Sequence, residues 1–140
     1  MEVSFLESDQ DFEELVPLVK AFSDFAKVPY WQQLNEVASS FTSQSVLTII
    51  GKDEGKIVAY LCGYYLNKED FMMTQIYSEN PKVTILIGKF TDSHLRSVGM
   101  KRILGLFKHD PRAAEKHGFK VDRYLMAKNI EKGESDVEVE

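Results

Sequence analysis

The fold is decided by DPRAAEKHGF, residues 110–119, a stretch that has the pattern of a short helix ending at a glycine. A glycine just beyond a helix end adopts the left-handed conformation that caps the helix, and Lys116 and His117 suit the negative end of the helix dipole. The apolar residues 103–107 precede this stretch, and the strand-like residues 120–129 follow it. We therefore expect a strand, a short helix and a second strand in this region.

Working outward, the rest of the chain alternates between helical and strand patterns. Ser8 is followed by a carboxylate three residues later, which predicts the start of a helix that is apolar on one face and interrupted or kinked at Pro17. Pro29 starts a second helix, in which Trp31, Leu34, Val37, Ala38 and Phe41 form a stripe that we expect in the core. The other expected elements are strands 2–6, 45–51, 56–66, 71–78, 101–108 and 119–129, and helices from 83 to near 99 and over 111–117.

Composition limits the class of protein. The chain has 140 residues, of which 44% are hydrophobic and 28% charged, as in one ordinary globular domain. No apolar run approaches the roughly 18–20 residues that span a bilayer, so no membrane segment is expected. Cys62 is the single cysteine and lies in an apolar run, which favours a buried structural thiol in a cytoplasmic protein over a nucleophile. The three scattered histidines give no metal-ligand spacing.

Charge is distributed unevenly along the chain. Residues 1–81 contain 5 basic and 13 acidic residues, a net charge of −8, whereas residues 82–123 contain 10 basic and 4 acidic residues, a net charge of +6. The basic segment could face a phosphorylated cofactor, a nucleic acid or an acidic partner, and a sequence pI of about 5.3 argues against nucleic acid. Residues 131–140 contain five acids and no aromatic residue, so we expect a flexible tail.

The order of elements over residues 1–130 resembles that of the GNAT superfamily of acyl-CoA-dependent N-acyltransferases. The resemblance rests on this order, on the hairpin GKDEGKIVAYLCGYYL at residues 51–66 and on EKHGF at 115–119. It implies an α/β (α+β) fold with one domain, helices on both faces and a mixed, mostly antiparallel central sheet. Two parallel strands, 71–78 and 101–108, would splay apart in that sheet.

The resemblance also implies where acetyl-CoA, or another acyl-CoA, would bind as co-substrate. The pantetheine arm would hydrogen-bond to the exposed backbone of Ile76, Tyr77 and Ser78. The pyrophosphate would lie at the start of the following helix, where free backbone N–H groups favour anions.

Pro81 has no N–H, so the expected donors at that helix start are Lys82, Val83 and Thr84. Arg112 and Lys116, one helical turn apart, could contact phosphate or could form an ordinary solvated helix face.

Three features that the family usually carries are absent from this sequence. Residues 78–85, SENPKVTI, contain no glycine, although the family's phosphate loop contains several. Ala114 stands at the position of the tyrosine that protonates the leaving thiolate, and Phe107 at that of an asparagine. The candidate replacements are Tyr77 and Tyr124 as proton donors, unless both only pack, and Glu79 as a base acting through water.

The sequence therefore predicts transfer of an acyl group from acyl-CoA to an amine by direct attack in a ternary complex. The acceptor would be a small molecule or a peptide, no metal is expected, and a homodimer is left open. The alternative is a catalytically silent GNAT-fold module, of a viral or mobile-element type, that binds a partner or forms an assembly. Loss of the three family features together is what that alternative predicts.

Overall fold

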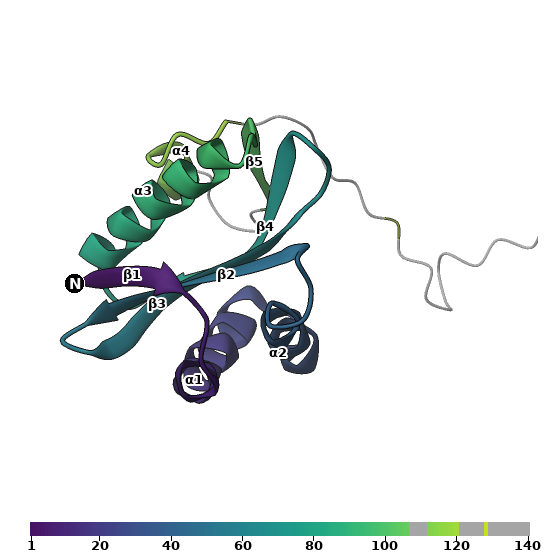
Figure 1. Cartoon of the computed structure of the whole chain (residues 1–140). Helices are drawn as coiled ribbons and strands as arrows, with labels where there is room; N and C mark the ends of the chain where they lie inside the picture. Colours follow the sequence, from purple (N-terminus) through teal and green to yellow (C-terminus); the bar gives the residue numbers. More distant parts are fainter. Residues whose placement is uncertain (107–111, 121–127, 129–140) are drawn as a thin grey trace, which may run out of the picture. The chain divides into compact units, whose positions relative to one another are not determined.

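The structure, a computed structural model, describes residues 1–106, 112–120 and 128 (Figure 1). The chain divides into two units, Met1–His109 and Asp110–Glu140. The first unit contains, in chain order, β1 (Glu2–Phe5), α1 (Asp9–Ala26), α2 (Tyr30–Ser39), β2 (Val46–Asp53), β3 (Lys56–Tyr65), β4 (Asp70–Ser78), α3 (Pro81–Ser97) and β5 (Arg102–Gly105). The second contains α4 (Arg112–Glu115).

The first unit is built around a five-stranded sheet in the order β1-β2-β3-β4-β5. The first four strands pair antiparallel with their neighbours, and β5 alone pairs parallel, with β4. Helices α1 and α2 lie on one face of the sheet and α3 lies on the other (Figure 1). The predicted mixed sheet, its parallel pair and the helices on both faces are thus confirmed.

The N-terminal helix begins where the sequence predicted and runs through the proline. The Ser8 hydroxyl accepts a hydrogen bond from the backbone N–H of Asp11 at 3.1 Å, which is the expected N-cap. Pro17 lies inside α1 without ending it, and the helix stops at Lys27, which has a left-handed backbone with φ of 56°. Pro29 is the N-cap position of α2 and makes no side-chain hydrogen bond to it. Helix α1 is not interrupted at Pro17, and a kink there stays a prediction.

The hairpin between β2 and β3 turns on two residues with positive φ, Glu54 at 52° and Gly55 at 80°. Two such residues between paired strands match the right-handed strand twist, as the sequence predicted for this turn. In the next turn the Asn67 side-chain oxygen accepts hydrogen bonds from the backbone N–H groups of Glu69 and Asp70, both at 2.8 Å. The side chain thereby fixes the point at which β4 begins.

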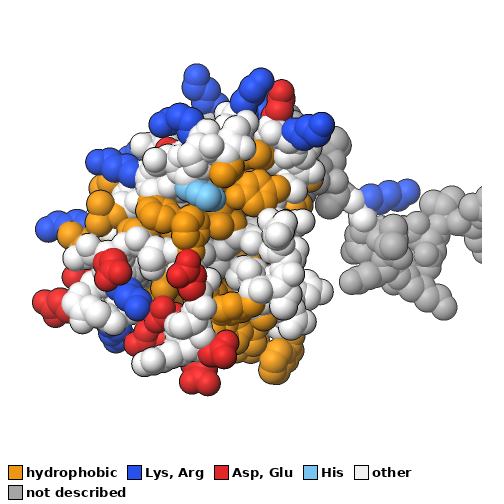
Figure 2. Space-filling view, in the orientation of Figure 1, with side chains coloured by type: hydrophobic (Ala, Val, Ile, Leu, Met, Phe, Trp, Pro, Cys, Tyr) orange, Lys and Arg blue, Asp and Glu red, His pale blue; other side chains and the backbone are white. Residues whose placement is uncertain are grey.

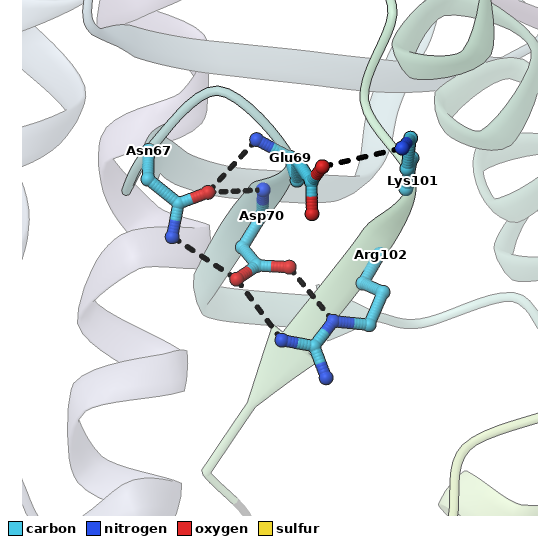
Figure 3. A network of polar contacts seen from close by, with 5 residues as sticks. All are labelled: Asn67, Glu69, Asp70, Lys101 and Arg102. Carbon is cyan, nitrogen blue, oxygen red and sulfur yellow. Dashed lines mark hydrogen bonds and ion pairs between the residues drawn. The ribbon is translucent and has the colours of Figure 1, made fainter.

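A polar network ties the beginning of β5 to the beginning of β4 (Figure 3). The Arg102 guanidinium donates to both carboxylate oxygens of Asp70, at 2.8 and 3.1 Å, and Asn67 donates to the same carboxylate at 3.0 Å. The backbone N–H groups of Lys101 and Arg102 both donate to the Glu69 carbonyl, at 2.8 and 3.0 Å. Because Asp70 is buried, this paired arrangement holds the two parallel strands together at one end.

The core between the sheet and the first two helices contains most of the predicted apolar residues, but two of them, Trp31 and Phe41, are exposed, and Phe41 lies beyond the end of α2. Leu15, Val19 and Val37 are fully buried there against the sheet. Trp31, expected in the core stripe of α2, is instead 71% exposed. It lies in the first turn of α2, and at 3.6 residues per turn it points about 120° around the helix from buried Val37.

The second unit confirms the glycine cap at residue 118. Gly118 has a φ of 89°, its N–H donates to the Glu115 carbonyl at 3.0 Å, and the Phe119 N–H donates to the Ala114 carbonyl at 3.2 Å. These two bonds are the Schellman pattern of a helix end. Phe119 and Lys120 lie in no strand, and residues 121–127 of the predicted last strand lie outside the described residues. The expected tail at residues 131–140 lies outside them as well, and among the described helices none is long and apolar enough to cross a membrane.

Two glycine substitutions should change stability in opposite directions. A Cβ on Gly63 would lie 2.3 Å from the Met72 carbonyl oxygen, a backbone atom that cannot easily move. We expect Gly63→Ala to lower the free energy of unfolding by about 1–3 kcal/mol. Gly88 lies within α3 with open space around it, so Gly88→Ala should raise that free energy by roughly 0.5–1 kcal/mol. Urea denaturation measures both, and equal effects of the two substitutions would contradict the close strand contact at Gly63.

The folded protein should lose stability at alkaline pH because two acidic side chains are buried protonated. Burial raises the pKa of Cys62 above its usual value of 9.0 and that of Tyr60 above 10.0. Above about pH 9 the unfolded chain therefore releases protons that the folded chain keeps, so the free energy of unfolding falls as the pH rises. Urea unfolding between about pH 7 and about pH 10.5 measures this fall, which should be smaller in Cys62→Ala. A free energy of unfolding that stays constant over this range would show that the two groups are not buried as described.

Candidate functional site

The candidate site is the part of β4 that β5 leaves uncovered. The two strands pair from Asp70 opposite Arg102 to Met73 opposite Gly105, whereas β4 continues to Ser78. Among the described residues, no strand pairs with residues 74–78 on the β5 side. The backbone of this stretch is therefore an open edge, at the place where the sequence predicted the splay. The predicted strand 101–108 is observed only over Arg102–Gly105, and residues 107 and 108 lie outside the described part.

The open edge begins at a β-bulge. Opposite β3, Gln75 pairs with Cys62 and Met73 pairs with Gly63, so that Thr74 is an additional residue in β4. A bulge bends its strand and redirects the side chains beside it. The Thr74 hydroxyl and the Gln75 amide both reach the same carboxylate, that of Glu36 on α2.

The three residues expected to contact pantetheine all lie on the open edge. Ile76 and Tyr77 are partly buried, and the Tyr77 side chain packs against the core on the α1–α2 side. The Ser78 hydroxyl accepts from the Asn80 N–H at 3.1 Å and donates to the Asn80 carbonyl at 2.8 Å. The side chain of Ser78 is thus occupied by the turn into α3, and contact with a ligand there would have to come from the backbone.

The start of α3 differs from the sequence expectation, because most of its N–H groups already have acceptors. The Asn80 side chain accepts from the Lys82 N–H at 3.0 Å, and the Thr84 N–H donates to the Asn80 carbonyl at 3.1 Å. Since Asn80 is the N-cap, Thr84 is the first residue whose N–H forms a regular helical bond, and it is not among the free donors. Of the three expected donors, Val83 alone has an N–H with no acceptor among the described residues, and its side chain is fully buried as predicted.

A carboxylate also lies at this helix start. The Asn80 amide donates to Asp53 Oδ2 at 3.2 Å, which places an acid from the end of β2 beside the positive end of the α3 dipole. The protein's own groups therefore provide the favourable contacts that a phosphate would otherwise make. The absence of glycine from residues 78–85, seen in the sequence, is matched by this self-capped geometry.

The remaining predicted site residues are divided between the two units and the part of the chain outside the described residues, so their convergence stays a prediction. Glu79 is exposed beyond the end of β4, and its N–H donates to the Val58 carbonyl at 2.9 Å. Lys82 is exposed in the first unit and Lys116 in the second, and the Arg112 side chain and Tyr124 lie outside what the structure describes. In the described part of the chain, no three His, Cys, Asp or Glu side chains are arranged to hold a metal ion.

Sequence analysis missed a polar cluster that the bulge assembles. Fully buried Gln75 accepts from the Tyr60 hydroxyl at 2.7 Å and donates to the Gln33 carbonyl at 3.0 Å and to Glu36 Oε1 at 2.8 Å. The sequence offered a weak signal, because Gln33 and Glu36 are three residues apart and so share one side of α2 beside the apolar stripe. The pairing of Glu36 with β4 depends on the bulge, which no residue pattern announced.

Similarity to known proteins is detectable in the structure but not in the sequence. No protein-family model and no curated protein sequence matches this chain. A ribosomal-protein-alanine N-acetyltransferase from Brucella melitensis is similar with a TM-score of 0.70 at 10% identity, over 93% of this chain and 100% of that one. The aminoglycoside acetyltransferase AAC(6')-Iy, solved with a CoA-based bisubstrate analogue, gives a TM-score of 0.72 at 10% identity, over 93% and 97% of the two chains.

A third similar structure, a predicted acetyltransferase from Clostridium acetobutylicum with acetyl-CoA, gives a TM-score of 0.69 at 11% identity over 91% of this chain and 96% of that one. At sequence identities this low, the structural similarity establishes the fold alone. The sheet order, the parallel β4–β5 pair and these similarities together show that the chain has the GNAT acetyltransferase fold.

Proposed function

We propose that this protein is an N-acyltransferase that moves an acetyl or other acyl group from acyl-CoA to an amine. The observation that carries the proposal is the open edge of β4 over residues 74–78, beside a strand that is held parallel at its start. Unpaired backbone groups in a strand edge are available to hydrogen-bond an extended ligand, and the amide-containing pantetheine arm has that character. Similar folds have been solved with CoA or acetyl-CoA bound, which supports the same co-substrate here.

Chemistry at this edge needs few side chains. Backbone N–H groups at the bulge can polarise a thioester carbonyl, and holding the two substrates together supplies a large part of the rate. These contributions do not require the tyrosine that Ala114 replaces. Of the two candidate proton donors, Tyr77 lies on the open edge. We propose that its hydroxyl donates a proton to the leaving thiolate.

The acceptor in this proposal is a cationic small molecule or peptide. Helix α1 carries five acidic residues and one lysine, whereas α3 carries three Lys or Arg residues and one aspartate. Figure 2 shows most acidic side chains of this face near α1 and most basic ones near α3. An acidic surface on the α1–α2 side attracts amines that carry positive charge. One similar structure, of the aminoglycoside acetyltransferase meta-AAC0020, holds sisomicin.

A second candidate function is a silent GNAT-fold module that binds a partner. It is favoured by the self-capped start of α3, where Asn80 and Asp53 occupy the place expected for pyrophosphate. Binding of the nucleotide part of CoA is therefore the property that separates the two candidates.

Binding of acetyl-CoA gives the first test. We expect isothermal titration to show a dissociation constant in the micromolar range, which corresponds to about −8 kcal/mol. S-acetyl-pantetheine, which lacks the nucleotide, should also bind, because the proposal places most of the contacts on β4. If neither acetyl-CoA nor S-acetyl-pantetheine binds at concentrations up to the millimolar range, the silent module is favoured.

Replacement of Asp53 tests the position of the pyrophosphate. If the phosphates lie at the start of α3, Asp53→Asn removes a repulsive charge and should tighten acetyl-CoA binding about threefold or more, without changing the affinity for S-acetyl-pantetheine. Glu54→Gln is the matched control, because it removes the same charge from the adjacent, exposed turn residue. If both substitutions have the same effect on acetyl-CoA affinity, the phosphates do not lie beside Asp53.

A further inference from the structure

Glu36 lies at the junction between α2 and the bulge of β4. Its Oε1 atom accepts a hydrogen bond from the Gln75 amide at 2.8 Å and another from the Thr74 hydroxyl. Gln75 is in turn held by the Tyr60 hydroxyl and by the Gln33 carbonyl. Four residues from α2, β3 and β4 therefore fix the position of one carboxylate oxygen.

This carboxylate has hydrogen-bond donors, and among the described residues it has no counter-ion. No Lys, Arg or His of the described residues forms an ion pair with Glu36, although the side chain is partly buried. The titratable groups that face it are Tyr60 and Cys62 on β3, and burial raises the pKa of both, so both are neutral at neutral pH. Hydrogen bonds offset part of the cost of burying a carboxylate, and a positive charge beside it offsets more. The cluster is therefore suited to receive a cation from outside the chain.

The carboxylate also lies next to the proposed reaction site. Thr74, which contacts Glu36 directly, is the first residue of β4 that lacks a β5 partner. Gln75, the next residue, has an amide side chain and cannot accept a proton at neutral pH. Cys62 remains protonated, and the exposed Glu79 lies beyond the end of β4. In the described part of the chain, Glu36 is the base closest in structure to the start of the open edge.

We propose that Glu36 binds the ammonium group of the acceptor and acts as the base of the transfer, an inference that rests on the proposed acyltransferase function. The ammonium gives one proton to the Glu36 carboxylate, and the nitrogen lone pair that is freed forms a bond to the thioester carbonyl carbon. The carbon–sulfur bond breaks, and its electron pair leaves with the sulfur. The thiolate then takes the second proton from the nitrogen, and Glu36 returns its proton to water. Amide and free thiol are the products.

Glu36→Gln tests this role with little disturbance of the structure, since a glutamine oxygen can still accept from Thr74 and Gln75. With sisomicin or spermidine as acceptor, we expect about a hundredfold lower kcat/KM near pH 7, and an unchanged dissociation constant for acetyl-CoA. The loss should shrink as the pH rises, because the amine then loses its proton in solution before it binds. Glu2→Gln removes the same charge from an exposed residue of β1, at the edge of the sheet opposite β5, and is the matched control that should retain full activity.

The outcomes separate this inference from the proposed function. If the native protein binds acetyl-CoA and acetylates an amine, but Glu36→Gln is equally active, the role of Glu36 is wrong and the acyltransferase function stands. A loss of the same size at every pH would also contradict it, because a purely structural effect behaves in that way. If the native protein binds no acetyl-CoA, the proposed function fails first.

A binding measurement tests Glu36 without turnover. Spermidine titrated into the complex of the protein with CoA should bind the native protein and should bind Glu36→Gln about tenfold or more weakly. If spermidine binds neither protein, or both equally, Glu36 is not the site of the acceptor cation.

Discussion

Strand β4 is paired on both edges at its start, whereas after residue 73 the described residues pair with it on one edge only, and the site depends on this difference. The Asp70–Arg102 pair, supported by Asn67 and by two backbone bonds to Glu69, holds β5 against β4 at the beginning of both strands. Without that attachment a four-residue parallel strand would contribute few hydrogen bonds of its own. Because pairing stops at Gly105, the next five residues of β4 present backbone groups that nothing else in the described sheet uses.

The bulge at Thr74 connects this edge to the helices on the other side of the sheet. Placing an additional residue in β4 brings Thr74 and Gln75 to one carboxylate on α2, where a regular strand would have turned one of them to the opposite face. The resulting network fully satisfies a buried amide, and in the described residues no buried side-chain polar atom lacks a partner. The same network holds Glu36 in a fixed position, with no counter-ion from the described part of the chain, so one structural feature supports both the core and the proposed chemistry.

The sequence predicted what local patterns control and missed what tertiary contacts control. Ser8, the Glu54–Gly55 turn and Gly118 each act through backbone geometry within a few residues, and all three were predicted correctly. Trp31 and Phe41 were misplaced because a periodic stripe shows neither how wide a sector of the helix the core covers nor where the helix ends. Thr84 was wrongly counted as a free donor because the helix start could not be located to the residue, and Asn80 and Asp53 meet only in the folded chain. Glu36 was missed for the same reason, since its partners lie more than 35 positions away in the sequence.

Amide hydrogen exchange, measured with and without acetyl-CoA, tests the central claim most directly. We predict that acetyl-CoA slows exchange at residues 74–78 of β4, which no described strand pairs on the β5 side, while exchange at Phe71 and Met72, already paired with β5, stays unchanged. Unchanged exchange over residues 74–78 in the presence of saturating acetyl-CoA would contradict the claim that this open edge is where the co-substrate binds.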